Sequence, residues 1–110
     1  MKKLITQKCI PCEGGIPPLS KDKFLPYLAE VKKWKVINGK KMERDFSFKN
    51  FKQALEFINT VGVIAEKEKH HPDILLYDWN NVKVVLWTHA IGGLSKNDFI
   101  VAAKIDHLLR

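Results

Sequence analysis

The chain has 110 residues, of which 45% are hydrophobic and 28% charged, and this fits one globular domain. No apolar run reaches the roughly 18 residues of a transmembrane helix, and the N-terminus lacks the apolar stretch of a signal peptide, so we expect a cytoplasmic protein that spans no membrane. The net charge of +7 comes mainly from dispersed lysines, with Arg44 and Arg110 as the only arginines. Because arginine is the residue favoured for base readout and bidentate phosphate contacts, a solvated basic surface is a better interpretation than nucleic-acid binding.

Residues 1–19 predict an irregular N-terminal arm, followed by a single catalytic domain over 20–110. The arm contains a C-x-x-C pair, Cys9 and Cys12, with Pro11 between the two cysteines and glycines and prolines after them. A second pair with zinc-site spacing is missing, and this composition is typical of a loop rather than of the helix start that a redox pair requires. We therefore expect two reduced thiols in an ordered arm.

The first regular elements are a helix and a hairpin. Ser20 is a typical N-cap for a helix that extends to about Lys33, and Pro26 inside it predicts a distortion. The apolar face of this helix is predicted to comprise Phe24, Leu28 and Val31. Strand-like runs at 34–38 and 41–48 flank Asn38-Gly39, which is a strong hairpin signal. In the second run the half-buried side is predicted to comprise Met42, Phe46 and Phe48, with Arg44 as the polar exception.

The clearest helix is predicted at 49–70, and Pro72 ends it because a residue before proline is disfavoured in the α region. The apolar residues at helical spacing are Phe51, Leu55, Ile58, Gly62 and Ala65. A second pair of strands follows at 74–79 and 82–89, with Asn80-Asn81 as the turn. Trp79 and Trp87 are ordinary strand aromatics in this interpretation.

The last helix is predicted at about 96–108. Ser95 and Asp98 have the spacing of a capping box at its start. Its apolar face is predicted to comprise Phe99, Ala102, Ala103 and Leu109. The order helix, hairpin, helix, hairpin, helix indicates an α+β fold, in which three helices pack on one face of a four-stranded antiparallel sheet.

The second face of that sheet also carries large apolar side chains. In the predicted strands Val85 and Trp87 point away from Val84, and Leu75, Tyr77 and Trp79 form the corresponding set on the neighbouring strand. Soluble monomers seldom leave such a patch exposed, so we expect a homodimer or homotetramer. The alternative is that the arm folds over this face with its apolar residues Ile10, Ile16 and Leu19.

Histidines are the candidate chemical groups. His70 is predicted in the last turn of the long helix, where the helix dipole and Glu66, four residues earlier, both favour the imidazolium form. His71, held extended by Pro72, should point elsewhere, and His89 ends the last strand. We expect His107, in the last helix, to lie on the surface.

Each of these residues also has a simpler interpretation. A histidine pair at a helix end can serve only as a C-cap, and a lone strand-end histidine needs no function. Asp98 is explained by capping alone. A zinc site formed by histidines is disfavoured, because adjacent histidines such as His70 and His71 rarely ligate one ion and no acidic or cysteine ligand has motif spacing.

Taken together, the spacing is more specific than its parts. Glu66, the segment His70-His71-Pro72, Trp79, His89 and Asp98 resemble the signature of the pterin-4a-carbinolamine dehydratase family. The segments FSFKNFKQALEFINTVGVIAEKEKHHP and THAIGGLSKNDFIVAAKID resemble the central and C-terminal parts of the family, and the resemblance covers about residues 9–107. Two residues depart from the family pattern: Lys69 stands where Asp is frequent and Ala90 where Glu is frequent. Both flank the predicted site, so they bear on substrate affinity more than on the chemistry.

The resemblance implies a hydro-lyase that dehydrates 4a-hydroxytetrahydropterin to quinonoid dihydropterin, in tetrahydrobiopterin recycling, without a metal or organic cofactor. It implies that His70 and His89 are proton donors and that His71 orients the pterin ring. The residues that it places in support of the histidines or around the substrate are Glu66, Lys69, Pro72, Trp87, Thr88, Ala90 and Asp98. Mammalian relatives also act as dimerisation cofactors of a transcription factor, so a noncatalytic protein-binding module is the alternative function.

Overall fold

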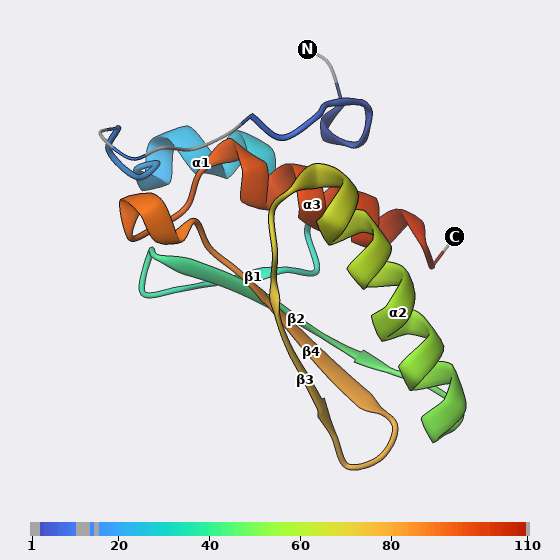
Figure 1. Cartoon of the computed structure of the whole chain (residues 1–110). Coiled ribbons are helices and arrows are strands. Elements are labelled where there is room, and N and C mark those ends of the chain that lie inside the picture. Colours follow the sequence, from blue (N-terminus) through green and yellow to red (C-terminus); the bar gives the residue numbers. More distant parts are fainter. Residues whose placement is uncertain (1–2, 11–13, 15, 110) are drawn as a thin grey trace.

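The structure, a computed structural model, describes residues 3–10, 14 and 16–109 (Figure 1). In chain order the elements are the 3-10 helix η1 (Leu4–Thr6), α1 (Lys21–Leu28), β1 (Lys35–Ile37), β2 (Lys41–Ser47), α2 (Phe51–Glu68), β3 (Asp73–Tyr77), β4 (Asn81–Leu86), the 3-10 helix η2 (His89–Ile91) and α3 (Lys96–His107). The four strands form one antiparallel sheet in the order β1-β2-β4-β3. The predicted α+β architecture is therefore confirmed. No helix among the described residues combines the length and apolarity that crossing a bilayer requires.

The core lies between the sheet and the helices. The pairing of β2 with β4 sets Met42 opposite Leu86 and Phe46 opposite Val82, and all four side chains are buried. Arg44 shares this face, since it pairs with Val84, and its guanidinium Nη1 lies 2.5 Å from Oδ1 of Asp106 on α3. This ion pair explains how one arginine interrupts an otherwise apolar side of the strand, because a half-buried charge needs a partner.

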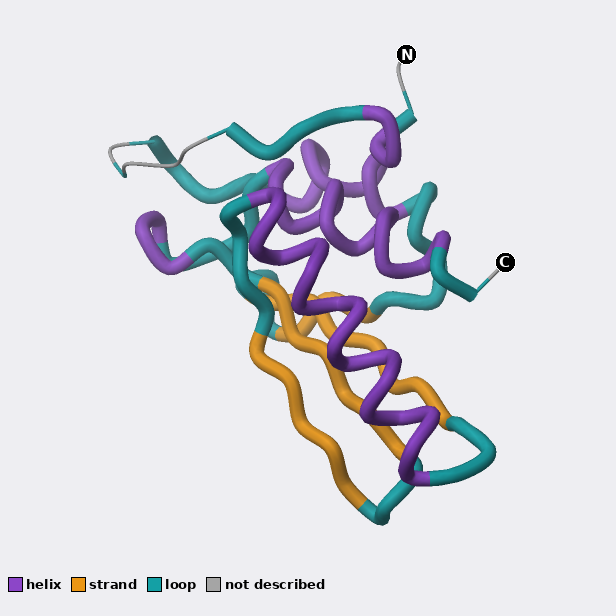
Figure 2. Tube along the Cα trace, turned by 45° about the vertical axis from the view of Figure 1, so that its right-hand side comes forward, coloured by secondary structure: helices purple, strands orange, loops and turns teal. Residues whose placement is uncertain are grey.

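The long helix α2 runs along the sheet (Figure 2), and its buried side matches the predicted one only in part, through Ala65 and the half-buried Ile58. Its buried apolar residues are Ala54, Phe57, Val61 and Ala65. Phe51 and Leu55, predicted to face the core, are 49% and 40% exposed. Both stripes have helical spacing, and the contacts of Phe57 decide between them: its ring centroid lies 4.7 Å from that of Phe46 and 4.9 Å from that of Phe48.

The other two helices also differ from the prediction in detail. The helix α1 ends at Leu28 rather than near Lys33, and Val31 is buried beyond its end. The helix α3 is buried on more sides than a single stripe, because it contacts η1, α1 and α2. Ile100, Val101 and Ile105 therefore join Phe99 and Ala102 in the core. Leu109 lies beyond the helix and is 47% exposed, so its predicted place in the core was wrong, whereas His107 is exposed as predicted.

One predicted turn is confirmed and the other is shifted. Asn38 and Gly39 both have positive φ, as the first hairpin requires. In the second hairpin the positive-φ residues are Asp78 and Trp79, whereas Asn81 already belongs to β4. The carboxamide of Asn80 donates to the Phe48 carbonyl oxygen at 2.8 Å, which ties this residue to the end of β2. Trp79 is consequently a turn residue that is 61% exposed, not a strand aromatic.

The described residues of the arm do not cover the outer face of the sheet. Its 3-10 helix η1 contacts α3, and Leu4 is fully buried there, on the helical side of the molecule (Figure 1). Ile10 and Ile16 remain 72% and 58% exposed. The alternative in which the arm shields the second sheet face was therefore wrong. Cys12 lies outside the described residues.

Candidate active site

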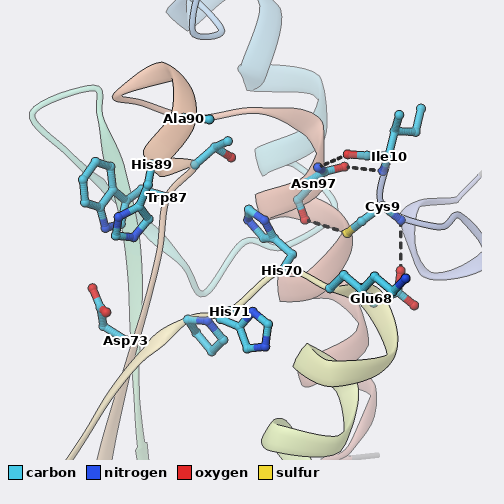
Figure 3. Close-up of a pocket in the computed structure, with 13 residues that line it drawn as sticks. Cys9, Ile10, Glu68, His70, His71, Asp73, Trp87, His89, Ala90 and Asn97 are labelled. Carbon is cyan, nitrogen blue, oxygen red and sulfur yellow. Dashed lines mark hydrogen bonds between the residues drawn. The ribbon is translucent and has the colours of Figure 1, made fainter. Parts of the chain in front are cut away.

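A cavity of about 630 Å³ opens where α2 ends, β4 ends and α3 begins. His70, His71 and His89 all line it, so elements that are far apart in the sequence bring the three histidines together (Figure 3). Lys69, Pro72, Trp87, Thr88 and Ala90 line it as well. The volume falls within the range of roughly 300–1,000 Å³ that is usual for small-molecule sites.

The end of α2 determines where His70 points. Lys69 adopts a left-handed conformation, with φ of 55° and ψ of 39°, so the helix ends at Glu68, two residues before His70. The His70 ring then reaches α3, and its Nε2 lies 2.6 Å from Oδ1 of Asp98. The histidine side chain is 12% exposed, whereas the aspartate is fully buried.

Asp98 is held by several groups besides this imidazole. Its Oδ2 accepts hydrogen bonds from the Thr88 hydroxyl at 2.8 Å and from the Ser95 backbone N–H at 2.9 Å. The second of these bonds belongs to the predicted capping box of α3, which is confirmed. Because a buried ionised carboxylate accepts and does not donate, Nε2 of His70 carries a proton in this pair. Nδ1 is then left as the ring nitrogen without a hydrogen-bond partner among the described residues.

The carboxylate of Glu66 does not support His70, contrary to the predicted contact four residues along a helix. It hydrogen-bonds Nε2 of His71 instead. The left-handed Lys69 is the reason, because it removes His70 from the helical face and brings the next residue toward Glu66. Both partners are exposed, at 62% for the histidine side chain and 79% for the carboxylate, so this is a surface pair of small energetic weight.

His89 approaches the cavity from the other side. The strand β4 ends at Leu86 rather than at His89 as predicted, and His89 begins η2. Its ring stacks on Trp87, with the centroids 3.8 Å apart, and Nζ of Lys41 lies 4.7 Å from the indole centroid. The two histidines are therefore held differently: His70 by the buried carboxylate of Asp98, and His89 by the indole face of Trp87, beside which it lies in Figure 3.

The loop after His89 is fixed by a close approach of the arm. Thr88 and Gly93 form an isolated antiparallel bridge, and Gly92 between them has a φ of 65°. A Cβ on Gly93 would lie 2.7 Å from Cβ of Pro18, so glycine is needed where the arm packs against this loop. This packing holds Thr88 in reach of Asp98.

Five further lining residues were not predicted. They are Cys9, Ile10, Glu68, Asp73 and Asn97. Asp73 directly follows the segment His70-His71-Pro72, and this adjacency was a usable signal. Glu68 and Asn97 likewise adjoin the predicted residues Lys69 and Asp98. Cys9 and Ile10 depend on where the arm docks, and no local pattern indicates that. Among the described residues no group of three histidine, cysteine or acidic side chains is arranged to hold a metal ion.

Comparison with known proteins places the chain in a family. The sequence model described as "Pterin 4 alpha carbinolamine dehydratase" matches residues 17–108. The chain belongs to the pterin 4 alpha carbinolamine dehydratase family. It is 53% identical over 107 residues to a protein of Alkaliphilus metalliredigens that is provisionally named a pterin-4-alpha-carbinolamine dehydratase, with 96% of each chain covered. A Rubrobacter xylanophilus protein with the same provisional name is 40% identical over 108 residues, with 98% of this chain and all of that protein covered.

Solved structures agree with this assignment. A crystal structure from Brucella melitensis, described as a transcriptional coactivator/pterin dehydratase, superposes with a TM-score of 0.76 at 29% identity, covering 83% of this chain and 97% of that one. A pterin dehydratase-like protein described as a RuBisCO assembly factor of the alpha-carboxysome superposes with a TM-score of 0.58, covering 69% of this chain and 88% of that one. At 19% identity the second likeness shows the dehydratase fold alone.

Proposed function

We propose that the protein is a hydro-lyase that removes water from 4a-hydroxytetrahydropterin to give quinonoid dihydropterin, in tetrahydrobiopterin recycling in the cytoplasm. The observation that carries this proposal is the pair of imidazoles lining one cavity, with the first of them, His70, fixed by the buried carboxylate of Asp98 at 2.6 Å. Membership of the family supports the same substrate class.

The reaction requires two proton movements. The C4a hydroxyl must gain a proton so that it leaves as water when the C4a–O bond breaks. The nitrogen N5 must lose its proton, and an electron pair of N5 forms the C4a=N5 double bond. The atoms balance with one water released and no redox change. A positioned acid or base contributes about 10²–10⁴ in rate to such a step, and imidazole is suited to both roles near neutral pH.

His70 is the better-positioned acid of the pair. With Nε2–H donated to Asp98, protonation of its free nitrogen gives an imidazolium that the buried carboxylate stabilises. Nδ1 then carries the proton that is delivered to the C4a hydroxyl. A fully buried carboxylate is a strong partner because little solvent screens it.

His89 serves the opposite side of the substrate. Its stacking on Trp87 fixes the plane of the ring while neither ring nitrogen is engaged by a neighbour in the described part of the chain. It is therefore free to exchange a proton with the pterin as donor or acceptor. His71, paired with the exposed Glu66, orients the ring rather than transferring the proton. Lys69, Pro72, Thr88 and Ala90 complete the substrate surface.

Three substitutions test the roles proposed for the three histidines. His70→Ala and His89→Ala should each lower the dehydration rate by at least ~10², the scale of one general acid. His71→Ala should raise KM more than it lowers kcat. Stopped-flow measurement on synthetic 4a-hydroxytetrahydropterin gives both constants, and near wild-type rates in both His70→Ala and His89→Ala would show that these roles are wrong.

A further inference from the structure

The residues Cys9 and Ile10 of the arm line the cavity, and two buried polar side chains hold their backbone in place. The Cys9 backbone N–H donates to Oε1 of Glu68 at 2.9 Å. Asn97 makes two bonds to the next residue: its Oδ1 accepts from the Ile10 N–H at 3.0 Å, and its Nδ2 donates to the Ile10 carbonyl oxygen at 2.6 Å. All three hydrogen bonds are therefore made to the backbone of the arm.

The two residues that bind the arm, Glu68 and Asn97, lie next to the proposed catalytic residue His70 and its partner Asp98. Glu68 is the last residue of α2, two positions before His70, and Asn97 directly precedes Asp98 on α3. The arm therefore bridges the two elements that hold the imidazole and its carboxylate. Glu68 is in turn fixed by Lys104 of α3, whose Nζ lies 2.7 Å from Oε2.

Both of these side chains are buried, at 8% exposure for Glu68 and 9% for Asn97. Burying polar groups costs free energy unless each one is hydrogen-bonded, and here the arm supplies the bonds. An apolar pair of similar size would need no such hydrogen bonds. Because the Glu68 side chain bonds the backbone of Cys9 and the Asn97 side chain bonds that of Ile10, the polar pair fixes which residues of the arm lie at this position.

With the backbone held by these hydrogen bonds, the side chain of Cys9 faces the cavity. In Figure 3 the thiol is directed from the arm toward the side of the cavity where His70 lies, whereas the Ile10 side chain points away. Its Sγ lies 3.6 Å from the Asn97 carbonyl oxygen. Burial, followed by the charge of Glu68, raises the pKa of the Cys9 thiol to about 12, so it is a neutral surface and not a nucleophile.

We propose that Asn97 is a positioning residue that holds the Cys9–Ile10 backbone as a wall of the pterin pocket, so that the arm contributes to substrate binding. This inference rests on the proposed function and adds a segment that the chemistry of the histidines does not involve. Asn97 acts through the arm and does not itself transfer a proton.

The first test separates binding from chemistry. Asn97→Ala should raise KM for 4a-hydroxytetrahydropterin by ~5- to 10-fold, the factor that one or two lost hydrogen bonds produce, with kcat within about 3-fold of wild type. Asn59→Ala, the same change at an exposed position of α2, should leave KM unchanged. An unchanged KM in Asn97→Ala, or an equal rise in Asn59→Ala, would overturn the proposal. If Asn97→Ala does not fold, Ile10→Pro takes its place, because it removes the backbone N–H that donates to Oδ1 of Asn97 and alters a side chain that is mostly exposed. The same rise in KM is expected.

The second test reports on the wall itself. In a Cys12→Ser background, the rate at which Cys9 reacts with a neutral disulfide reagent should be low and should fall further when 7,8-dihydropterin fills the pocket. In Asn97→Ala the thiol should react faster, and the dihydropterin should protect it less. Equal reaction rates with and without dihydropterin would show that Cys9 is not part of the pocket.

Different results would overturn the proposed dehydratase function and the proposed role of the arm. If wild-type protein binds the dihydropterin and protects Cys9 but does not dehydrate the substrate, the proposed function is wrong and the wall stands. If wild-type protein is active while Asn97→Ala keeps both the KM and the thiol protection of wild type, only the wall is wrong.

Discussion

Asp98→Asn is the substitution that most sharply probes the buried carboxylate. The amide is nearly isosteric with the carboxylate, and its oxygen can still accept the bonds from Thr88 and from the Ser95 N–H, at 2.8 and 2.9 Å in the wild-type protein. The third bond is different. Where Oδ1 accepts from Nε2 of His70 at 2.6 Å, the amide presents an N–H donor. Two donors then face each other unless the imidazole changes its tautomer and gives up the proton on Nε2.

Two magnitudes follow from this single lost bond. Stability should fall by about 1.5–3 kcal/mol, the usual value of a hydrogen bond to a charged group, because the other two bonds are kept. The rate should fall by about 10²–10⁴, because the imidazole loses both its proton arrangement and its counter-charge. The chemistry is therefore expected to suffer far more than the fold.

The measurement combines stopped-flow dehydration with denaturant unfolding of the same preparations. Asp45→Asn is the matched control, since it removes a hydrogen-bonded carboxylate that accepts from Tyr77 on an exposed strand position. This control should keep the wild-type rate. A folded Asp98→Asn protein with a rate within about 3-fold of wild type would refute the account of the His70–Asp98 pair.

Three further predictions concern the arm, metal and assembly. Burial raises the pKa of Glu68, but the bonds from Lys104 and the Cys9 N–H outweigh burial and leave this pKa below the ordinary 4.5, so the stability it contributes is present above that value and is lost as the pH falls through the lowered pKa. The stability difference between wild type and Glu68→Gln, measured by thermal unfolding, should therefore shrink from pH 7 to pH 3; a constant difference would contradict this. EDTA treatment should leave dehydration intact, and one zinc per chain lost together with activity would revive a metal site. Sedimentation equilibrium at micromolar concentration should show a dimer or tetramer, because Leu75 on the outer sheet face and Phe51 and Leu55 on α2 stay exposed, and a single species of 12.7 kDa would refute this.

The sequence predicted those features whose cause is local. Asn38-Gly39 has the chemistry of a positive-φ turn, and Ser95 and Asp98 have the spacing of a capping box, so neither needs information from the rest of the chain. The resemblance to the family signature, rather than any single residue, implied that the three histidines share a site, and one cavity does bring them together.

The features that failed depend on tertiary contacts. The helix α2 has two apolar stripes, and only the packing of Phe57 against Phe46 and Phe48 selects between them. The exchange of partners at Glu66 follows from one left-handed residue, Lys69, whose side chain carries no strong signal for that conformation. The arm docks through Asn97, 87 residues from Ile10, and no pattern of local spacing records such a contact.

The most direct test of the central claim is stopped-flow dehydration of 4a-hydroxytetrahydropterin by the wild-type protein, measured against the reaction in buffer alone. We predict a rate that rises in proportion to protein concentration and returns to the buffer rate in the double variant His70→Ala/His89→Ala, which also excludes a contaminating dehydratase. A wild-type rate equal to that in buffer would contradict the account and would favour a noncatalytic protein-binding role for this scaffold.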